Sequence, residues 1–139
     1  MTEPIPAFEL GEPGPMRDRL VEAVLAGRKT ATSSLRVFYD MEDAWLPRSG
    51  DRYQLIDSAH EKLGVVEATT VDIVPLGGVG DDVALAEGEG FTNALEWRAA
   101  HVAFWDRYRD DVLRYLDDPS WVVDDATEVV VEYFRLVSP

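Results

Sequence analysis

Hydrophobic residues near the N-terminus recur with the spacing of an amphipathic helix. Pro15 suits a first helical position, and Gly27 supplies a stop signal. One face of this predicted helix carries four apolar side chains, Met16, Leu20, Ala23 and Val24. Residues 31–38 then favour a strand or an extended loop. Residues 40–51 form a polar excursion that ends in a predicted turn at Ser49 and Gly50.

The middle and the end of the chain have the β-branched patterns of strands. Residues 52–57 and 63–74 alternate roughly between apolar and polar positions and flank a short polar turn, which predicts an antiparallel pair. Residues 127–137 form a dense apolar run, which predicts a strand in the middle of a sheet. Between these strands we predict a short helix with a glycine-rich end in residues 81–90 and a longer helix in residues 93–109.

The longer predicted helix carries an aromatic stripe, because Trp97, His101, Phe104 and Tyr108 align at spacings of three and four. The order of a helix, several strands, further helices and a last strand indicates an α+β domain built on a mixed or closed sheet. At 139 residues, with 46% hydrophobic and 29% charged residues, the chain is predicted to form one domain over residues 1–139.

The formal net charge of −14 restricts the partners of the protein. A phosphate backbone repels such a surface, which argues against a long nucleic-acid duplex. Residues 81–134 carry a net charge of −10, whereas residues 26–53 carry +1, which leaves room there for one nucleotide or a short strand. No run approaches the roughly 20 apolar residues of a membrane span, and no signal-peptide pattern is present. We therefore expect a cytoplasmic protein with no membrane partner.

The least acidic segment contains the main candidate for chemistry, Ala-Gly-Arg-Lys-Thr-Ala-Thr-Ser-Ser-Leu at residues 26–35. Only two of the 13 basic residues are lysines, and Lys29 precedes four hydroxyl side chains. An amine can lose a proton and act as a base, which a guanidinium cannot do. Lys29 could therefore activate the Thr32 hydroxyl as a nucleophile once a ligand excludes water. Alternatively, Lys29 caps the preceding helix, and Thr30 and Thr32 begin a strand.

Other groups are further candidates. Glycines lie on both sides of Glu89, and Glu87 precedes the first of them. Two carboxylates in one pocket would raise one pKa into the range useful for acid catalysis, and the alternative is a solvated turn. His101 is either a core residue or a catalyst, and Arg98 either pairs with a surface acid or contacts a ligand. The chain has no cysteine, and its two histidines have no partner at ligand spacing, so we expect no metal.

These residues resemble the ASCH domain family, whose fold is similar to that of PUA RNA-binding domains. The family signature is Gly-x-Lys-x-x-Thr-x-Arg after a first helix. Gly27, Lys29 and Thr32 match this signature, and Ser34 stands where the arginine would be. The resemblance extends to a bacterial subgroup through Thr-Ala-Thr after the lysine, a turn with Pro47, Gly50 and Asp51, Glu-Gly-Glu-Gly at residues 87–90, and Trp97-Arg98 followed by His101.

The resemblance implies a PUA-like mixed or antiparallel β-barrel with flanking α-helices, in which the lysine motif lines a cleft. Members of the family are associated with RNA binding, with ribonuclease activity and with hydrolysis of the acetyl group of acetylated cytidine. By this resemblance, Lys29 acts as the base, Thr32 as the nucleophile and Glu87 as an acid or oxyanion partner. Glu89 is the alternative carboxylate.

We therefore expect a protein that binds a nucleoside, a nucleotide or a short single-stranded RNA and hydrolyses it as an amidohydrolase or ribonuclease. The alternative is a non-catalytic regulatory module that binds the same ligands. No cofactor is predicted. Arg98 is predicted to replace part of the function of the missing arginine. The predicted ligand contacts are Ser34, Glu89, Trp97, Arg98 and His101.

Overall fold

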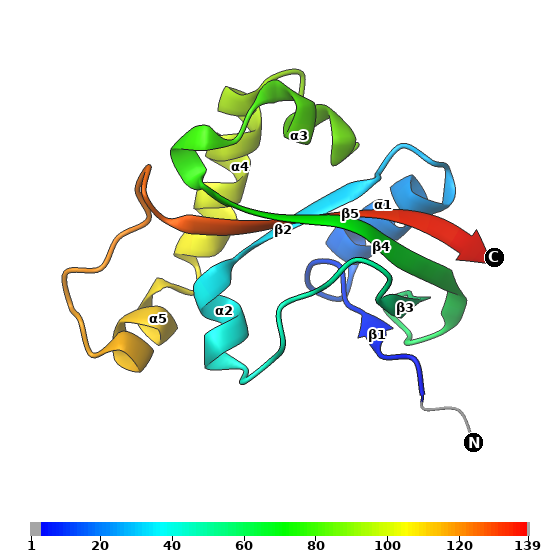
Figure 1. Cartoon of the computed structure of the whole chain (residues 1–139), viewed down its shortest axis with the longest axis horizontal. Coiled ribbons are helices and arrows are strands. Elements are labelled where there is room, and N and C mark those ends of the chain that lie inside the picture. Colours follow the sequence, from blue (N-terminus) through cyan, green and yellow to red (C-terminus); the bar gives the residue numbers. More distant parts are fainter. Residues whose placement is uncertain (1–3, 139) are drawn as a thin grey trace.

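A curled five-stranded sheet forms the centre of the computed structural model, which describes residues 4–138, and helices lie on both sides of this sheet (Figure 1). Its strand order is β1-β3-β4-β5-β2. β1 pairs in parallel with β3, and the other neighbours are antiparallel. The predicted α+β class and mixed sheet are therefore confirmed, with the sheet curled into a half-barrel. The strands are β1 (Ala7–Phe8), β2 (Ala31–Leu35), β3 (Arg52–Ile56), β4 (Lys62–Pro75) and β5 (Glu128–Ser138).

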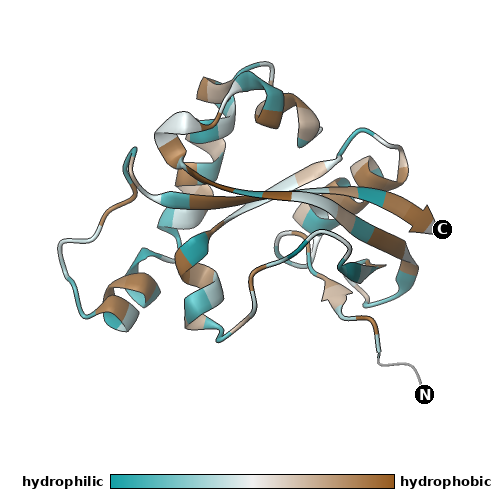
Figure 2. Cartoon of the chain, viewed as in Figure 1, coloured by the Kyte–Doolittle hydropathy of each residue, from teal (hydrophilic) through white to brown (hydrophobic). Residues whose placement is uncertain are grey.

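β5 is an interior strand of the sheet, as its apolar run predicted. It pairs with β4 on one side and with β2 on the other. Val129, Val130 and Val131 are all nearly inaccessible to solvent, because both faces of β5 are covered. Hydrophobic and hydrophilic segments alternate along the strands that cross the centre of the molecule (Figure 2). The predicted antiparallel pair of residues 52–57 and 63–74 corresponds to β3 and β4.

Helices account for the remaining regular structure. α3 lies on one side of the crossing strands in Figure 1, and α2 and α5 lie on the other. The predicted helices after Pro15, Gly80 and Asn93 are present, and the Asn93 side chain caps α4 by accepting a hydrogen bond from the Glu96 backbone N–H. The helices are α1 (Pro15–Leu25), α2 (Arg36–Met41), α3 (Asp81–Ala86), α4 (Ala94–Asp106) and α5 (Arg109–Leu116), with a 3₁₀ turn at Leu76–Gly78.

Two helices differ from the prediction. The segment predicted as strand or loop over residues 31–38 changes to α2 after Leu35. α5 follows α4 after a short break and was not predicted, although its sequence is amphipathic and buries Val112. Both helices are short, and short helices depend on packing against neighbouring elements.

Two clusters of buried side chains form the core. The first lies between the sheet and the helices α3 and α4, and includes Leu35, Trp97 and Val131. The second joins α1 to β1, β3, β4 and β5. α1 buries Arg17, Val21, Ala23 and Val24, and the half-buried Leu20 packs against the second cluster while it also lines a cavity. Of the predicted apolar face, Leu20, Ala23 and Val24 therefore contribute to the core, whereas Met16 lines the cavity.

Within residues 4–138, no helix combines the length and the apolar character that crossing a bilayer requires.

Candidate functional site

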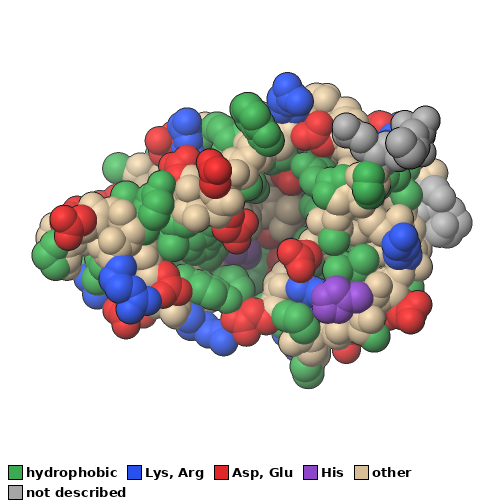
Figure 3. Space-filling view, turned by 90° about the horizontal axis from the view of Figure 1, so that it is seen from below, with side chains coloured by type: hydrophobic (Ala, Val, Ile, Leu, Met, Phe, Trp, Pro, Cys, Tyr) green, Lys and Arg blue, Asp and Glu red, His purple; other side chains and the backbone are tan. Residues whose placement is uncertain are grey.

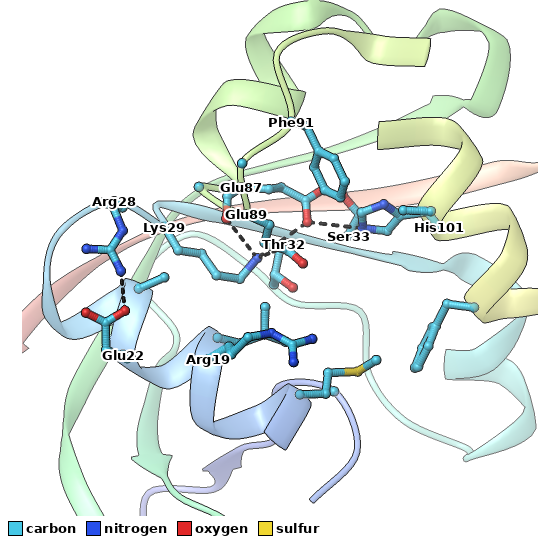
Figure 4. Close-up of a pocket in the computed structure, with 18 of the residues that line it drawn as sticks. Arg19, Glu22, Arg28, Lys29, Thr32, Ser33, Glu87, Glu89, Phe91 and His101 are labelled. Atoms are coloured by element: carbon cyan, nitrogen blue, oxygen red, sulfur yellow. Dashed lines mark hydrogen bonds and ion pairs between the residues drawn. The ribbon is translucent and has the colours of Figure 1, made fainter. Parts of the chain in front are cut away.

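A cavity of about 640 Å³ lies between α1, β2, α4 and the segment that follows α3. The molecule is hollowed on the face shown in Figure 3, where hydrophobic and acidic side chains surround the opening. The polar part of the cavity wall consists mainly of Lys29, Thr32, Ser33, Glu87, Glu89 and His101, and Figure 4 shows these side chains converging. The cavity therefore collects the lysine motif, both glutamates and the histidine that the sequence singled out.

Lys29 enters this cavity from the turn that ends α1. The Lys29 backbone N–H bonds to the carbonyl of Ala23, and Gly27 takes a positive φ of 81° in the same turn. The Lys29 side chain is only 1% exposed. Its Nζ lies 3.1 Å from Glu89 Oε2, 3.4 Å from Glu87 Oε1 and 3.3 Å from the Glu87 carbonyl oxygen. Three acceptors thus match the three hydrogens of an ammonium group.

Glu87 is the most enclosed acid of the site. It follows the last residue of α3, and its side chain is 1% exposed. One carboxylate oxygen accepts hydrogen bonds from Ser33 Oγ at 2.5 Å and from the Trp97 indole N–H. Burial raises its pKa, but hydrogen bonding from His101 and the charge of Lys29 outweigh burial and lower that pKa to about 2. Glu87 is therefore a carboxylate at neutral pH.

His101 is held between two acceptors. Its Nδ1 lies 2.8 Å from the Trp97 carbonyl oxygen, and its Nε2 lies 3.3 Å from Glu87 Oε1. Both partners are acceptors, which is the geometry that suits an imidazolium, whose two ring nitrogens both donate. Burial lowers the pKa of His101, but the hydrogen bond to Glu87 and the charge of Glu87 raise it by more, so the net shift is upward. The site thus places Lys29 and His101 against two carboxylates.

The first glycine of the Glu-Gly-Glu-Gly segment, Gly88, lies in close contact with the backbone of Arg28. Gly88 has a positive φ of 65°, and a Cβ atom there would lie 2.2 Å from the carbonyl oxygen of Arg28. The Thr30 backbone N–H also donates to the Ala86 carbonyl at 2.7 Å. These contacts hold the end of α3 against the start of β2, and they bring Lys29 and Glu87 together across 58 residues of chain.

The hydroxyl groups of β2 lie in different places. Ser33 bonds to Glu87, and Ser33 and Thr32 both line the first cavity. Ser34 lines a second cavity of about 580 Å³, which shares Thr32 and Ser33 with the first. Ser34 thus lines the second cavity and not the first, and its contact with a ligand stays a prediction. Within residues 4–138, no hydrogen bond joins the Thr32 hydroxyl to Lys29 Nζ.

Two predicted ligand contacts lie elsewhere. Trp97 is completely buried, and its indole N–H donates to the Glu87 carboxylate, so the prediction that it contacts a ligand is wrong. Arg98 forms an ion pair with Asp125 and lines neither cavity, so it does not replace the missing arginine of the signature. The reason is helical geometry, because one residue after the inward-facing Trp97 the side chain points about 100° away.

Arg19 and Arg28 supply positive charge at the first cavity, and the sequence analysis missed both. Arg28 pairs with Glu22 at the rim. Arg19 lies three residues after Met16 and one before Leu20, both of which line the same cavity (Figure 4). The position of Arg19, three residues after Met16, would have predicted that it lines the cavity if Met16 and Leu20 had been recognised as cavity residues.

Glu87, Glu89 and His101 each offer one potential metal-ligand atom, and these atoms lie within 4.8 Å of one another. The Lys29 ammonium lies among the same oxygens, at 3.1 and 3.4 Å. A divalent cation would have to displace this ammonium or share its partners. The cluster therefore fits an internal lysine cation better than a bound metal.

A curled half-barrel sheet with a buried lysine and glutamate at its edge is the arrangement that the sequence resemblance implied. The family model of the ASCH domain matches residues 7–138, so the chain belongs to the ASCH domain family.

Two solved structures are similar to it. Protein EF3133 from Enterococcus faecalis has 27% identity and a TM-score of 0.78, over 99% of this chain and 78% of its own. An ASCH domain from Lactobacillus crispatus has 24% identity and a TM-score of 0.74, over 88% of this chain and 72% of its own. No curated protein matches this chain.

Proposed function

We propose that this ASCH domain binds an acylated nucleoside in the cavity beside Lys29 and hydrolyses its amide bond. The supporting observation is the shared wall of that cavity, where Lys29, Thr32, Glu87 and Glu89 lie together. Its volume of about 640 Å³ lies within the range of roughly 300–1,000 Å³ that is usual for small-molecule sites. The charge of −14 favours a small ligand over a long polyanion.

In the proposed reaction, Thr32 is the nucleophile and Lys29 is the base. In the free protein, Lys29 Nζ donates to two carboxylates. A bound ligand that excludes water favours the neutral pair, in which one proton moves from Nζ to Glu89. The free amine then takes the Thr32 proton, and the hydroxyl oxygen attacks the amide carbon.

The remaining steps return the site to its starting state. The protonated Lys29 stabilises the oxyanion of the tetrahedral intermediate and then donates its proton to the departing amine. The acyl group now forms an ester with Thr32. Water, deprotonated by Lys29, attacks that ester. The acyl–oxygen bond to Thr32 breaks, the Thr32 oxygen takes back a proton from Lys29, and a carboxylic acid is released. When the products leave, the proton on Glu89 returns to Nζ. The net reaction adds one water to the amide and yields one acid and one amine.

Glu87 is a positioning residue in this scheme. Its low pKa keeps it ionised throughout, and its bonds to Ser33, Trp97 and His101 fix the carboxylate against which Lys29 is held. Glu89 is 25% exposed and contacts Lys29 from the open side of the cavity. Glu89 is therefore better suited than Glu87 to accept a proton during turnover.

A non-catalytic binding module is the second candidate function. One observation favours it, namely that Lys29 Nζ bonds to three oxygens of Glu87 and Glu89 and, among the described residues, to no Thr32 hydroxyl. In such a module, Lys29 and Thr32 contact the ligand and no covalent step occurs.

The distinguishing experiment is turnover of acetylated cytidine, followed by chromatography of the released cytidine. We expect turnover by the wild-type chain and at least a hundredfold loss in Thr32→Val, which keeps the size of the side chain but removes the nucleophile. Lys29→Arg should lose turnover similarly, since a guanidinium cannot serve as the base. Thr70→Val, at an exposed position of β4, is the matched control and should retain full rate.

Binding of acetylated cytidine without turnover would support the module instead. Equal rates for the wild-type chain and Thr32→Val would show that Thr32 is not the nucleophile. Trapping an acyl ester on Thr32 by rapid acid quench and peptide mass spectrometry would support the covalent step directly.

A further inference from the structure

Two buried ionisable side chains outside the Lys29 cluster each retain an atom without a hydrogen-bond partner. Among residues 4–138, Glu132 Oε2 and Arg17 Nη1 are the only buried side-chain nitrogen or oxygen atoms in this condition. Glu132 is 5% exposed and Arg17 is 3% exposed. An unpaired polar group in a protein interior costs free energy, so two such groups require an explanation.

Both residues line the second cavity. Arg17 reaches it from α1. Its Nε and Nη2 donate to the carbonyls of Leu10 and Gly11, and Nη1 has no hydrogen-bond partner among the described residues. Glu132 reaches it from β5, where it is the register partner of Thr32. The same cavity thus holds an acidic acceptor and a basic donor, neither of which has used its full capacity.

The rest of this cavity is suited to a flat ring. Its walls include the rings of Tyr39, Tyr53 and Phe104. Trp45 also lines it and is 95% exposed, although large aromatic side chains are usually at least partly covered. Aromatic side chains of this kind stack on nucleic-acid bases.

The second cavity adjoins the first. Thr32, Ser33, Phe104 and Trp105 line both. A ligand whose reactive bond lies at Thr32 can therefore extend from one cavity into the other. Its ring would lie between the aromatic walls on the side away from Lys29.

We propose that the second cavity is a nucleobase subsite, in which Arg17 donates to a ring carbonyl or ring nitrogen and Glu132 accepts from an N–H or O–H of the same nucleoside. Trp45 stacks on the exposed face of the ring. This inference rests on the proposed function for its connection to Thr32, but the binding itself needs no chemistry. A nucleoside is the fitting class because it presents donors, acceptors and an aromatic face within one small molecule.

The test is binding of cytidine and uridine, neither of which carries a bond to hydrolyse in the proposed reaction. Isothermal titration with Thr32→Val measures the affinity in a chain that cannot turn over. We expect Glu132→Gln in that background to weaken nucleoside binding at least tenfold, and Glu132→Leu to weaken it further. The matched control is Glu61→Gln, at an exposed turn position, which should leave affinity unchanged.

A second readout separates recognition from a structural role. Because the carboxylate is buried without a full set of partners, Glu132→Gln should raise the melting temperature of the free protein while it reduces the shift that cytidine produces. Trp45→Ala should weaken binding about fivefold or more without lowering the melting temperature, and Trp45→Phe should restore most of the affinity. Ribose alone tests whether the sugar hydroxyls suffice.

Failure of the two proposals would look different. If the chain binds cytidine through Glu132 but does not deacylate acetylated cytidine, the subsite is supported and the proposed reaction is contradicted. Equal affinity for Glu132→Gln and its background would overturn the subsite, as would no detectable binding of either nucleoside at millimolar concentration. Ribose binding as strong as that of the nucleosides would also overturn it, because the ring would then contribute nothing.

Discussion

Lys29 Nζ lies 3.4 Å from Glu87 Oε1, and each of the two side chains is 1% exposed. Neither charge would be stable alone in that position, since desolvation of an unpaired ion costs several kcal/mol. Their pairing explains why the lysine motif at the end of α1 and the glutamate at the end of α3 require one another. It also makes the pair a sensitive place to test the site.

Lys29→Met should lower the free energy of unfolding by about 3–5 kcal/mol, because it leaves Glu87 and Glu89 buried or half-buried without their cation. Urea unfolding followed by fluorescence measures this value. Lys62→Met is the matched control, because Lys62 is exposed at the start of β4. It should change stability by less than about 0.5 kcal/mol.

The double variant Lys29→Met with Glu87→Gln should recover part of the loss, because it removes the unpaired carboxylate as well. A loss for Lys29→Met no larger than that of Lys62→Met would show that the buried pair contributes nothing to stability.

Gly88→Ala should be severely destabilising, by about 3 kcal/mol or more, because a Cβ there combines a positive φ with overlap against backbone atoms of Arg28. Gly90→Ala is the matched control. Gly90 also has a positive φ, of 94°, but nothing lies within 4 Å of the place that an added methyl group would occupy, so only the backbone strain of about 1–2 kcal/mol applies. Thermal and urea unfolding of both variants would check the difference, and equal losses would contradict the close contact.

Trp97→Phe should cost about 1.5–3 kcal/mol more than Trp105→Phe. Both substitutions shrink a buried indole of the same core cluster. Only the first removes a hydrogen bond to the Glu87 carboxylate, since the Trp97 indole N–H is its donor. Parallel urea titrations of the two variants measure the difference. Similar losses would mean that Trp97 matters for its volume alone.

The sequence predicted much of the fold because its signals are local. Pro15, Gly27 and Asn93 mark helix ends by chemistry that acts within a few residues, and the β-branched runs of β4 and β5 follow from their burial. α2 and α5 were missed because their stability comes from tertiary contacts. Membership of the ASCH domain family is confirmed. The resemblance also predicted Lys29, Thr32 and Glu87 in one cleft, and all three line the first cavity. The subgroup and the chemical roles of these residues stay predictions.

The remaining site residues depend on three-dimensional placement. Residue spacing relates Arg19 to Met16 and Arg98 to Trp97, but which face of each helix lines a cavity is decided by how that helix packs, and the spacing alone does not give the packing. The same is true of Arg17 and Glu132, which read in the sequence as an ordinary helical arginine and a polar residue in a buried strand. Only the assembled sheet reveals that both are enclosed beside one cavity.

Glu132 should give the protein an unusual dependence of stability on pH. Burial and the nearby Asp51 raise its pKa from 4.5 to about 7, although the Tyr53 hydroxyl acts in the opposite direction. Between these two pH values the folded chain binds a proton at Glu132 that the unfolded chain has released. Stability from this residue is therefore present at low pH and is lost as pH rises toward 7, by up to about 3 kcal/mol.

The pKa of His101 is also raised in the folded chain, so the contribution of His101 to stability is likewise lost as pH rises above its unfolded pKa of about 6.5. Comparison with Glu132→Gln isolates the glutamate, because both chains retain His101 and the neighbouring Asp51, Tyr39, Tyr53 and Arg17. We expect the advantage of Glu132→Gln over the wild-type chain in urea unfolding to grow from pH 5 to pH 8. A constant difference across that interval would mean that Glu132 titrates as an ordinary exposed carboxyl and that its enclosure beside the second cavity is wrong.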